Sequence, residues 1–440
     1  MTSRRLVDLE CKTIIIDAGA EGKNSDVVLQ QLKNFSPQAI VLSVATPTVD
    51  SDLGWFLPLL KSEMPNIPIL AVGIHVTALA KESLQIYSGL DFVILGEPEI
   101  IVGDLLSKKL EDRDLSQILG IAYRDLDGSI KVNGVRELTD DLDSLGIPDW
   151  EKIDFSNYIM PIKGTAFSLV HFARGCPHRC SYCTAHTYNG RSFRKRSVES
   201  LMQEIEFNIS LGVKDFLFWT ELLTGDVKYL NSVLDTIIER KLHEKIRWVC
   251  NSRVDTVSLD ILKRMKEAGC WQIAFGFDFG SDRMLKLTKK GGRANVELAK
   301  KAAAMASEAG LAVDGHFMLG YPGETEVEMI QTINLALSMP LTFSHFYAVV
   351  PYPGSQLYSD WIKLKKDQVL PNWDQFDQTQ AVIETAELTT EKIKSYKKSA
   401  YRRFYLRPSL ILRIAKLPKS IYELSNLTRA SLHLVKSLLF

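Results

Sequence analysis

Six short apolar runs alternate with amphipathic stretches of helical length between residues 167 and 350. The strand-like runs lie at about 167–173, 213–219, 246–250, 271–276, 311–318 and 343–350, and the helical patterns between them lie at about 197–210, 226–240, 257–268, 293–309 and 325–338. Strands that alternate with helices predict a parallel sheet. Six repeats indicate an incomplete β/α barrel, because the closed form has eight. The open side of such a barrel can admit a large substrate.

A compact cysteine motif follows the first of these runs. Cys176, Cys180 and Cys183 have the spacing C-x3-C-x2-C, and Tyr182 precedes the last cysteine. Iron–sulfur clusters are usually held by four thiolates, so three thiolates leave one iron with an open coordination position. In a β/α barrel the working residues stand at the carboxyl ends of strands, which is where this loop lies. The motif predicts a metal cluster with room for a further ligand.

Structural zinc is the alternative interpretation, because His186 could complete a Cys3His site with the same cysteines. Zinc modules usually supply their ligands as two separated pairs, whereas Cys250 and Cys270 lie far downstream in apolar surroundings. We expect those two, and Cys11 beside its own apolar run, to be core residues. Six cysteines in 440 residues are too sparse for a disulfide framework.

The cysteine loop resembles the signature of the radical S-adenosylmethionine (SAM) superfamily. Further segments together resemble those radical SAM enzymes that have an amino-terminal cobalamin-binding domain, near the anaerobic magnesium-protoporphyrin monomethyl ester cyclase and the hopanoid-modifying enzymes. These segments are 193–197, 251–255, 265–270, 320–325, 351–354 and 401–408. The resemblance implies a 4Fe–4S cluster on the three cysteines, which cleaves SAM reductively so that the resulting radical attacks an unactivated carbon. It also implies a hydrophobic substrate, such as a lipid, isoprenoid or tetrapyrrole, and an electron donor such as flavodoxin or ferredoxin.

Polar residues at the ends of later barrel strands are candidates for holding SAM, together with Tyr182. Glu221 follows the second strand, Arg253 the third, and Asp278 ends the fourth. Arg253 could bind the SAM carboxylate through its guanidinium fork, while Asp278 or Glu221 could accept hydrogen bonds from the ribose hydroxyls or the amine. The alternative is that each is an ordinary helix cap or salt bridge. Thr325 in particular is a credible N-cap for the helix that follows it.

The amino-terminal part has a β/α alternation of its own, with apolar runs at 13–18, 38–45, 67–73 and 91–95. It predicts a doubly wound, Rossmann-like α/β domain. Ligands of such sheets bind at the carboxyl ends of the strands, here 43–48, 73–75 and 96–97. The alternative is that Gly73 and Gly96 make tight turns and that His75 is a surface residue.

Cobalamin is possible but doubtful in this domain. Relatives usually have a β-strand and a glycine-proline-rich loop ahead of the segment 6–18, and the Asp-x-His-x-x-Gly motif is absent. Loss of a central strand leaves a gap in the ladder unless a neighbour closes it. Bound cobalamin would favour methylation of carbon, and its absence would favour cyclisation, rearrangement or oxidation. A non-enzymatic cobalamin-sensing or redox-sensing protein is the remaining alternative.

We expect four parts: a cobalamin-binding-type domain over 1–120, a hairpin and linker over 121–165, the radical SAM barrel over 166–385, and a basic helical segment over 386–440. Residues 401–440 carry eight positive charges and one negative charge, a net charge of +7, interleaved with leucines. Such helices can lie on an anionic membrane surface, or they can pack on the barrel with their charges in solvent. Both interpretations stay open.

The remaining composition is uninformative about substrate. The formal net charge is zero, and no 18-residue apolar run or targeting segment is visible. We therefore expect a cytoplasmic protein, with peripheral membrane contact through 401–440 as a possibility. Transfer-RNA methylthiolation enzymes share the cluster loop but normally add amino-terminal cysteines and a basic carboxyl-terminal β domain, which this sequence lacks. A nucleic-acid partner is therefore not expected.

Overall fold

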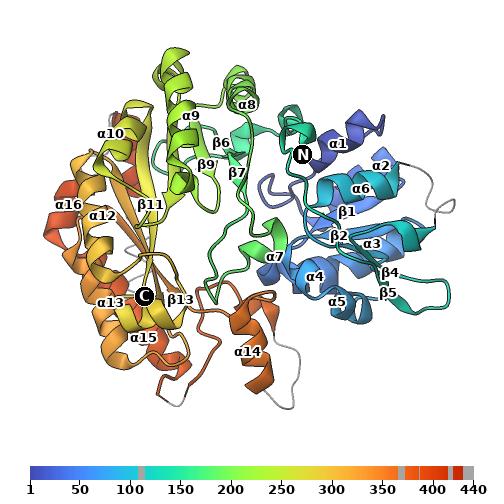
Figure 1. Cartoon of the computed structure of the whole chain (residues 1–440). Coiled ribbons are helices and arrows are strands. Elements are labelled where there is room, and N and C mark those ends of the chain that lie inside the picture. Colours follow the sequence, from blue (N-terminus) through green and yellow to red (C-terminus); the bar gives the residue numbers. More distant parts are fainter. Residues whose placement is uncertain (108–113, 365–371, 386, 415–419, 430–440) are drawn as a thin grey trace.

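Two separate sheets organise the chain, a mixed sheet in the amino-terminal half and a parallel sheet in the other half (Figure 1). The computed structural model describes residues 1–107, 114–364, 372–385, 387–414 and 420–429. The smaller sheet belongs to the amino-terminal part and the larger to the part that carries the cysteines. The predicted α/β class is confirmed.

The amino-terminal sheet has five strands in the order β1-β2-β3-β4-β5. Its strands are β1 (Ile40–Ser43), β2 (Ile69–Val72), β3 (Phe92–Ile94), β4 (Ile121–Arg124) and β5 (Ile130–Val132). Its helices are α1 (Thr2–Asp8), α2 (Ser25–Phe35), α3 (Leu57–Glu63), α4 (Ile74–Ala78), α5 (Ala80–Ile86) and α6 (Pro98–Leu106). Alternate strand residues bury on opposite faces: Leu70 joins the core beneath α1 and α6, and Ala71 joins the core on the other face.

The strand expected over 13–18 is wrong, because residues 11–17 have no regular structure. β1 instead pairs directly with β2, Ile40 lying opposite Ile69. A run of isoleucines has a high β-propensity, but propensity alone does not place it in a ladder, and this run joins none of the five described strands. The gap that a missing central strand would leave is therefore closed by a neighbouring strand.

The hairpin expected after residue 120 is present, but it extends the amino-terminal sheet. β4 pairs antiparallel with β3, and β5 pairs antiparallel with β4. Asp125 accepts from the backbone N–H of Gly128 at 2.9 Å, which closes the turn. The hairpin thus belongs to this sheet, and the expected linker begins after β5.

The second sheet has six parallel strands in the order β13-β12-β11-β10-β9-β6, so the predicted six-stranded open barrel is confirmed. The strands are β6 (Phe167–His171), β9 (Asp215–Trp219), β10 (Arg247–Ser252), β11 (Cys270–Asp278), β12 (Ala312–Leu319) and β13 (Phe343–Ala348). A separate two-stranded ribbon pairs β7 (Ala173–Arg174) with β8 (Arg194–Lys195). In the sequence, β7 precedes the cysteine motif and β8 follows it.

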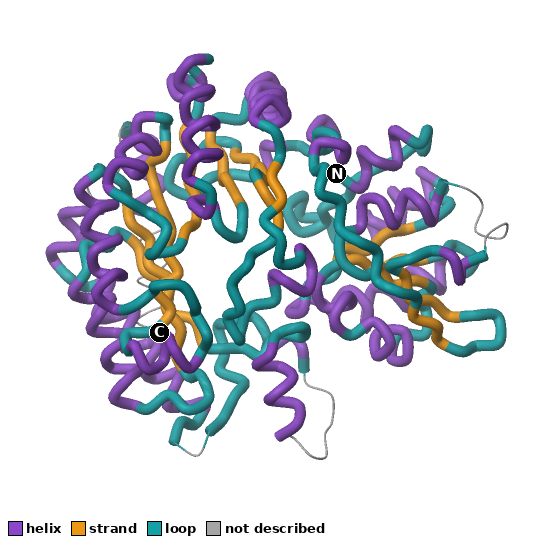
Figure 2. The backbone as a smooth tube through the Cα atoms, viewed as in Figure 1, coloured by secondary structure: helices purple, strands orange, loops and turns teal. Residues whose placement is uncertain are grey.

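Helices cover the outer face of this sheet, and its inner face turns toward the middle of the molecule (Figure 2). They are α8 (Val198–Ser210), α9 (Val227–Glu239), α10 (Leu259–Glu267), α12 (Val296–Glu308) and α13 (Glu326–Ser338), with α7 (Ala185–Asn189), α11 (Asp282–Leu287) and α14 (Gln356–Leu364) in loops. Phe216, Phe275 and Phe317 are fully buried in the core under these helices. Cys250 and Cys270 lie in the same core, as expected, while Cys11 is half-buried.

The carboxyl-terminal helices α15 (Thr390–Tyr405) and α16 (Pro408–Ile414) pack on the barrel. Phe404 is fully buried against β13, and Leu410 belongs to the same core. The part of the basic segment up to Leu410 therefore contributes to the barrel's core. Residues 421–429 are also helical, and residues 415–419 and 430–440 lie outside the described structure.

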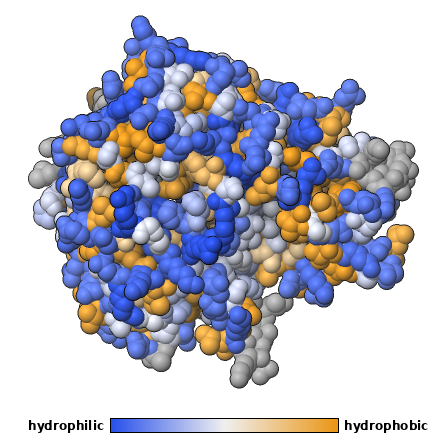
Figure 3. Space-filling view, in the orientation of Figure 1, coloured by the Kyte–Doolittle hydropathy of each residue, from blue (hydrophilic) through white to orange (hydrophobic). Residues whose placement is uncertain are grey.

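The described helices include none that is both long enough and apolar enough to cross a lipid bilayer. Hydrophobic and hydrophilic residues are interspersed over the face of the molecule drawn in Figure 3. Membrane contact through residues 401–440 stays a prediction.

Candidate active site

The cysteine loop leaves the barrel at the end of β6 and returns through the β7–β8 ribbon. Gly175 begins the loop with φ +91°, and a Cβ there would collide with the carbonyl oxygen of Ser192. A glycine is therefore required where the two sides of the loop approach each other. Cys176, Cys180 and Cys183 follow, all half-buried.

The three thiols lie in partly buried environments beside backbone groups of neighbouring segments. Cys180 Sγ donates to the carbonyl oxygen of Lys290 at 3.5 Å, and Cys183 Sγ accepts from the N–H of Ala185 at 3.5 Å. Burial raises the pKa of Cys176, and raises that of Cys183 to about 11, so a metal must displace both protons.

A single zinc ion requires ligand atoms that converge on one point. Over the described residues, no set drawn from the three cysteines and His186 brings three ligand atoms within 4.8 Å of one another. Thiolates of a cluster bind different irons and stand further apart. Among the described residues, the three cysteines and His186 therefore lack the convergence that a Cys3His zinc site needs, and three thiolates are a donor set that a 4Fe–4S cluster with one open iron could use.

Glu221 stands where the sequence predicts it, after β9, and it holds the two ends of the loop. Its carboxylate accepts from the N–H of Gly175 at 3.2 Å and from the side-chain amide of Asn189. Asn189 lies at the end of α7, beyond the last cysteine. Glu221 therefore fixes the loop, and its predicted contact with SAM stays a prediction.

Tyr182, Asp278 and Lys290 form one hydrogen-bonded group. The hydroxyl of Tyr182 donates to the carboxylate of Asp278, and the ammonium of Lys290 lies 2.5 Å from the same carboxylate. Burial, and then the charge of Asp278, raise the pKa of Tyr182 well above its usual value, so its hydroxyl keeps its proton.

Asp278 has an unusual backbone at the end of β11. Its φ is +62°, and the pairing of β11 with β12 shifts register between Gly276 and Asp278. A bulge re-aims the side chain at the strand end, and positive φ in a non-glycine residue costs free energy that the surroundings must offset. The local backbone thus places the side chain of Asp278 beside the cysteine loop.

Arg253 is buried, and most of its guanidinium N–H groups already donate hydrogen bonds within the protein. It forms a fork to Asp255, with N···O distances of 2.9 and 3.1 Å, and donates to the carbonyl oxygens of Lys290 at 3.0 Å and Gly291 at 2.9 Å. The carbonyl of Lys290 also accepts from Cys180. Arg253 therefore anchors the segment that contacts the cysteine loop, and its predicted pairing with the SAM carboxylate stays a prediction.

The loop after β12 reaches the same site. Tyr321 and Ser181 share a hydrogen bond of 2.8 Å between their hydroxyl oxygens. Thr325 caps α13 in a reciprocal capping box with Glu328, so its interpretation as an N-cap is confirmed. Sequence reasoning missed Lys290 and Asn189. The pair Gly291-Gly292, both at positive φ, marks the turn that presents Lys290 and is the signal that could have found it.

The predicted ligand loops of the amino-terminal sheet are covered. His75, after β2, is buried, with its Nδ1 3.3 Å from Thr46 Oγ1. The ring of Trp373 meets it edge-on with centroids 4.7 Å apart, and the backbone N–H of Trp373 donates to Asp50 at 2.9 Å. Burial lowers the pKa of His75 to about 4, so it is neutral. The alternative that placed His75 on the surface is wrong.

The loop that follows β1 and the loop that follows β2 also contact each other. A Cβ on Gly73 would collide with the carbonyl oxygen of Val44. The loop after β2 and the loop after β1 therefore pack against each other at the strand ends, where a ligand would approach. Val49, Trp373 and Phe376 pack in one core with the sheet. Close packing at the ends of β1 and β2 supports the expectation that cobalamin binds weakly or not at all, which stays a prediction.

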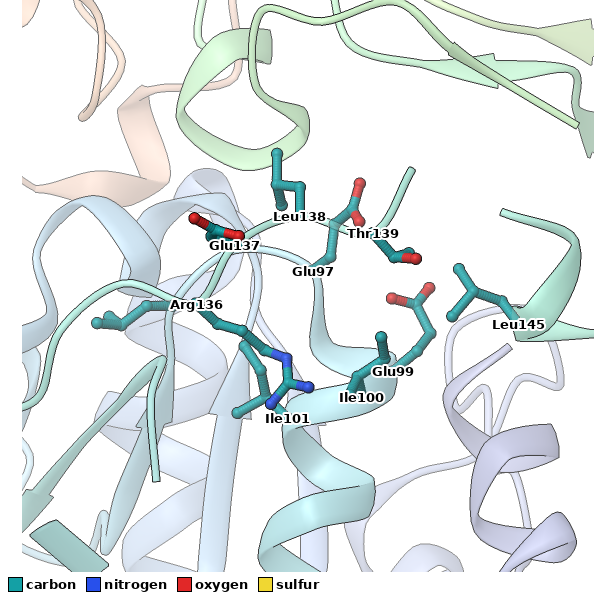
Figure 4. A pocket seen from close by; sticks show the side chains of 10 residues that line it. Glu97, Glu99, Ile100, Ile101, Arg136, Glu137, Leu138, Thr139 and Leu145 are labelled. Carbon is teal, nitrogen blue, oxygen red and sulfur yellow. The ribbon is translucent and has the colours of Figure 1, made fainter. Parts of the chain in front are cut away.

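Gly96 and Glu97, the third predicted ligand loop, join the two halves of the molecule. Glu97 forms ion pairs with Arg194 at 2.5 Å and Arg174 at 3.4 Å, while Glu99 pairs with Arg174 at 2.7 Å. Figure 4 shows both carboxylates at the start of α6, where they line a small pocket. Arg174 stands two residues before Cys176, so these pairs tie the cysteine loop to the amino-terminal sheet.

Comparison with protein families and curated proteins gives the same picture. The model of the radical SAM superfamily matches residues 170–336, from within β6 to within α13. An uncharacterized methyltransferase of Pyrococcus horikoshii is 28% identical over 400 residues, 91% of this chain and 85% of that protein. The anaerobic magnesium-protoporphyrin IX monomethyl ester cyclase of Cereibacter sphaeroides is 25% identical over 402 residues, 90% of this chain and 64% of the cyclase.

Two solved structures share the fold at lower identity. OxsB, a cobalamin-dependent SAM radical enzyme with aqua-cobalamin bound, aligns with a TM-score of 0.74 at 16% identity, covering 100% of this chain and 68% of OxsB. TsrM, a radical SAM methyltransferase from Kitasatospora setae with cobalamin and a 4Fe–4S cluster bound, aligns with a TM-score of 0.68 at 17% identity, covering 82% of this chain and 71% of TsrM. The chain therefore carries a radical SAM domain over residues 170–336.

Proposed function

We propose that this chain binds a 4Fe–4S cluster through Cys176, Cys180 and Cys183 and uses it to cleave SAM reductively. The single observation that carries the proposal is the cysteine loop itself, three half-buried thiols at the carboxyl end of the first barrel strand. A cluster held there would supply the one electron that cleaves SAM to methionine and a 5′-deoxyadenosyl radical, and this radical would take a hydrogen atom from the substrate.

The residues around the loop position the reactants. Asp278 offers a carboxylate to the SAM amine or ribose, and Tyr182 and Lys290 hold that carboxylate in place. Arg253 keeps the backbone at Lys290 and Gly291 against Cys180. Glu221 holds the loop ends together, which limits the movement of all three thiols.

The proposed substrate is hydrophobic, such as a lipid, isoprenoid or tetrapyrrole. The inner face of the barrel supports this, because Leu169, Leu217 and Val249 alternate with core residues and so face inward. Trp219, at the end of β9, is 41% exposed. The relative from Cereibacter sphaeroides is named for a tetrapyrrole.

Because Thr46 and Trp373 pack against His75 at the strand ends of the amino-terminal sheet, we favour cyclisation, rearrangement or oxidation of the substrate over methyl transfer through cobalt. A small one-electron donor, such as flavodoxin or ferredoxin, is the expected partner. Its role is to return the electron spent on each SAM molecule.

The test is anaerobic reconstitution of the wild-type chain and of Cys180→Ala. We expect four irons per wild-type chain, a cluster spectrum, and 5′-deoxyadenosine when SAM and a reductant are added. Cys180→Ala should lose the cluster and the product, whereas Cys250→Ala, a core cysteine outside the loop, should keep both. Stoichiometric zinc without iron in strictly anaerobic protein would contradict the proposal.

A further inference from the structure

Asp314, His316 and His345 form a second group of metal-binding side chains, on neighbouring barrel strands. Asp314 and His316 lie on β12, and His345 lies on β13 directly opposite His316. Across the described ranges, this is the one group of three or more histidine, cysteine and acidic side chains whose ligand atoms all lie within 4.8 Å of one another. Sequence spacing gives no sign of it, since His345 lies 29 residues after His316 and 31 residues after Asp314.

These side chains face the inside of the barrel. Val313 and Phe317 of β12 and Phe346 of β13 are fully buried in the core under the helices. Successive strand residues point to opposite faces, so Asp314, His316 and His345 point to the inner face. The side chains of His316 and His345 are 37% and 42% exposed, whereas that of Asp314 is 8% exposed. A buried carboxylate thus lies behind two accessible imidazoles.

The separations between their atoms suit ligands of one ion. His345 Nε2 lies 3.5 Å from Asp314 Oδ2, and His316 Nε2 lies 3.7 Å from the same oxygen. Good hydrogen bonds to oxygen are shorter. Zinc binds imidazole nitrogen and carboxylate oxygen at about 2.1 Å, so two ligands at a tetrahedral angle lie roughly 3.4 Å apart. The observed distances are close to this value.

Asp314 has a buried oxygen without a partner. Its Oδ1 has no hydrogen bond among the described residues. Leaving a buried charged acceptor without a hydrogen bond destabilises the folded state. A cation bound by both carboxylate oxygens, or by Oδ2 with a coordinated water on Oδ1, would remove this cost.

Outer partners orient the ligands in the way that metal sites require. His316 Nδ1 lies 3.3 Å from the hydroxyl of Tyr347, and the side-chain amide of Gln272 donates to Asp314 Oδ2 at 3.2 Å. Metal-binding histidines usually donate their second ring N–H to such a group, which fixes the tautomer and leaves the other nitrogen for the metal. Here Nε2 of His316 is the nitrogen left free.

We infer that Asp314, His316 and His345 bind one divalent transition-metal ion of the zinc type on the inner face of the barrel. Two histidines and a carboxylate are the protein ligands of many catalytic zinc sites, which keep a fourth position for water or a substrate oxygen. Asp314 pairs with Ala274, four residues before Asp278, so the ion lies roughly 13 Å along the strands from the level of Asp278. It is a site separate from the cysteine loop.

The test measures metal binding directly and does not need SAM. The tag-free chain, with its cluster reconstituted anaerobically, is treated with a chelator and then titrated with Co²⁺ or Zn²⁺. We expect one ion per chain in addition to the cluster iron, and visible Co²⁺ absorption without thiolate charge-transfer bands. His345→Gln and Asp314→Asn should each weaken binding by more than about 100-fold, and Tyr347→Phe by about 10- to 100-fold.

His243→Gln is the matched control, because His243 lies in a turn between α9 and β10 and should not affect binding. Circular dichroism and the cluster spectrum check folding. If Asp314→Asn does not fold, the half-exposed His345 and Tyr347 variants decide the question. No Co²⁺ bound after desalting, undiminished binding in those variants, or thiolate charge-transfer bands would each overturn the inference. The last outcome would show that the cysteines take the ion.

Discussion

Arg174→Met tests the buried ion pairs that join the cysteine loop to the amino-terminal sheet. Arg174 lies 2.7 Å from Glu99 and 3.4 Å from Glu97, and the three side chains are at most 10% exposed. Removing one partner of a buried pair leaves an uncompensated charge and costs about 3–5 kcal/mol. Glu97 keeps Arg194, so most of the loss should come from Glu99. We expect the free energy of unfolding to fall by about 3 kcal/mol.

The loss should depend on pH. Burial alone would raise the pKa of Glu99, but the charge and hydrogen bonds of Arg174 hold it below its usual value. In the wild type, Glu99 therefore stabilises the fold above its unfolded pKa, and this contribution disappears as pH falls through the lowered folded value. Without Arg174, burial raises the pKa of Glu99, so its ionisation opposes folding as pH rises. The difference in stability should be larger at pH 8 than at pH 5.

The assay is urea unfolding of the reconstituted protein at both pH values, followed by circular dichroism. Adding Glu99→Gln to Arg174→Met should restore about 1 kcal/mol or more, because it removes the stranded charge. Arg240→Met is the control, since Arg240 pairs with Glu199 and Glu206 at the surface and should matter by less than about 1 kcal/mol. A loss below about 1 kcal/mol for Arg174→Met, or strictly additive double-variant effects, would refute the reasoning.

Three further results are expected. Hydroxocobalamin should stay free after gel filtration with the chain, because His75 and Trp373 cover the strand ends; retention at micromolar concentration would count decisively against this. Phe404→Ala should lower the free energy of unfolding by about 3–5 kcal/mol, because Phe404 is fully buried, and a smaller change in urea unfolding would show that α15 packs loosely. If residues 401–440 contact a membrane, anionic vesicles should bind the full chain and salt should weaken this binding, whereas binding that salt does not affect would contradict the electrostatic argument.

The sequence predicted the barrel well because its signals are local. Each apolar run and each amphipathic stretch specifies an element by its own periodicity, and three cysteines within eight residues are neighbours in any fold. The run at 13–18 misled, because β-propensity does not state which edge is available for pairing. The described sheet consists of β1 to β5, and this run joins none of them.

Contacts between distant segments could not be predicted from the sequence. Trp373 covers His75 from nearly 300 residues away, so a residue that looked like a ligand or a surface group is part of the core. Asp314, His316 and His345 meet through the register of β12 on β13, which no spacing rule supplies. The partners of Arg253 and Asp278 likewise depend on the turn at 289–292. Residue type could nominate these positions, but tertiary structure determines what they bind.

The docking of α15 on β13 also bears on how this protein stays dispersed in solution. β13 is the last strand of an open sheet, and such an edge can recruit a strand from another copy. Its outward N–H groups are already bonded: Ser344 to the hydroxyl of Tyr405 at 3.1 Å, Phe346 to that of Tyr401 at 3.2 Å, and Ala348 to the carbonyl of Gln378 at 3.1 Å. The two tyrosines therefore protect the chain against edge-to-edge aggregation.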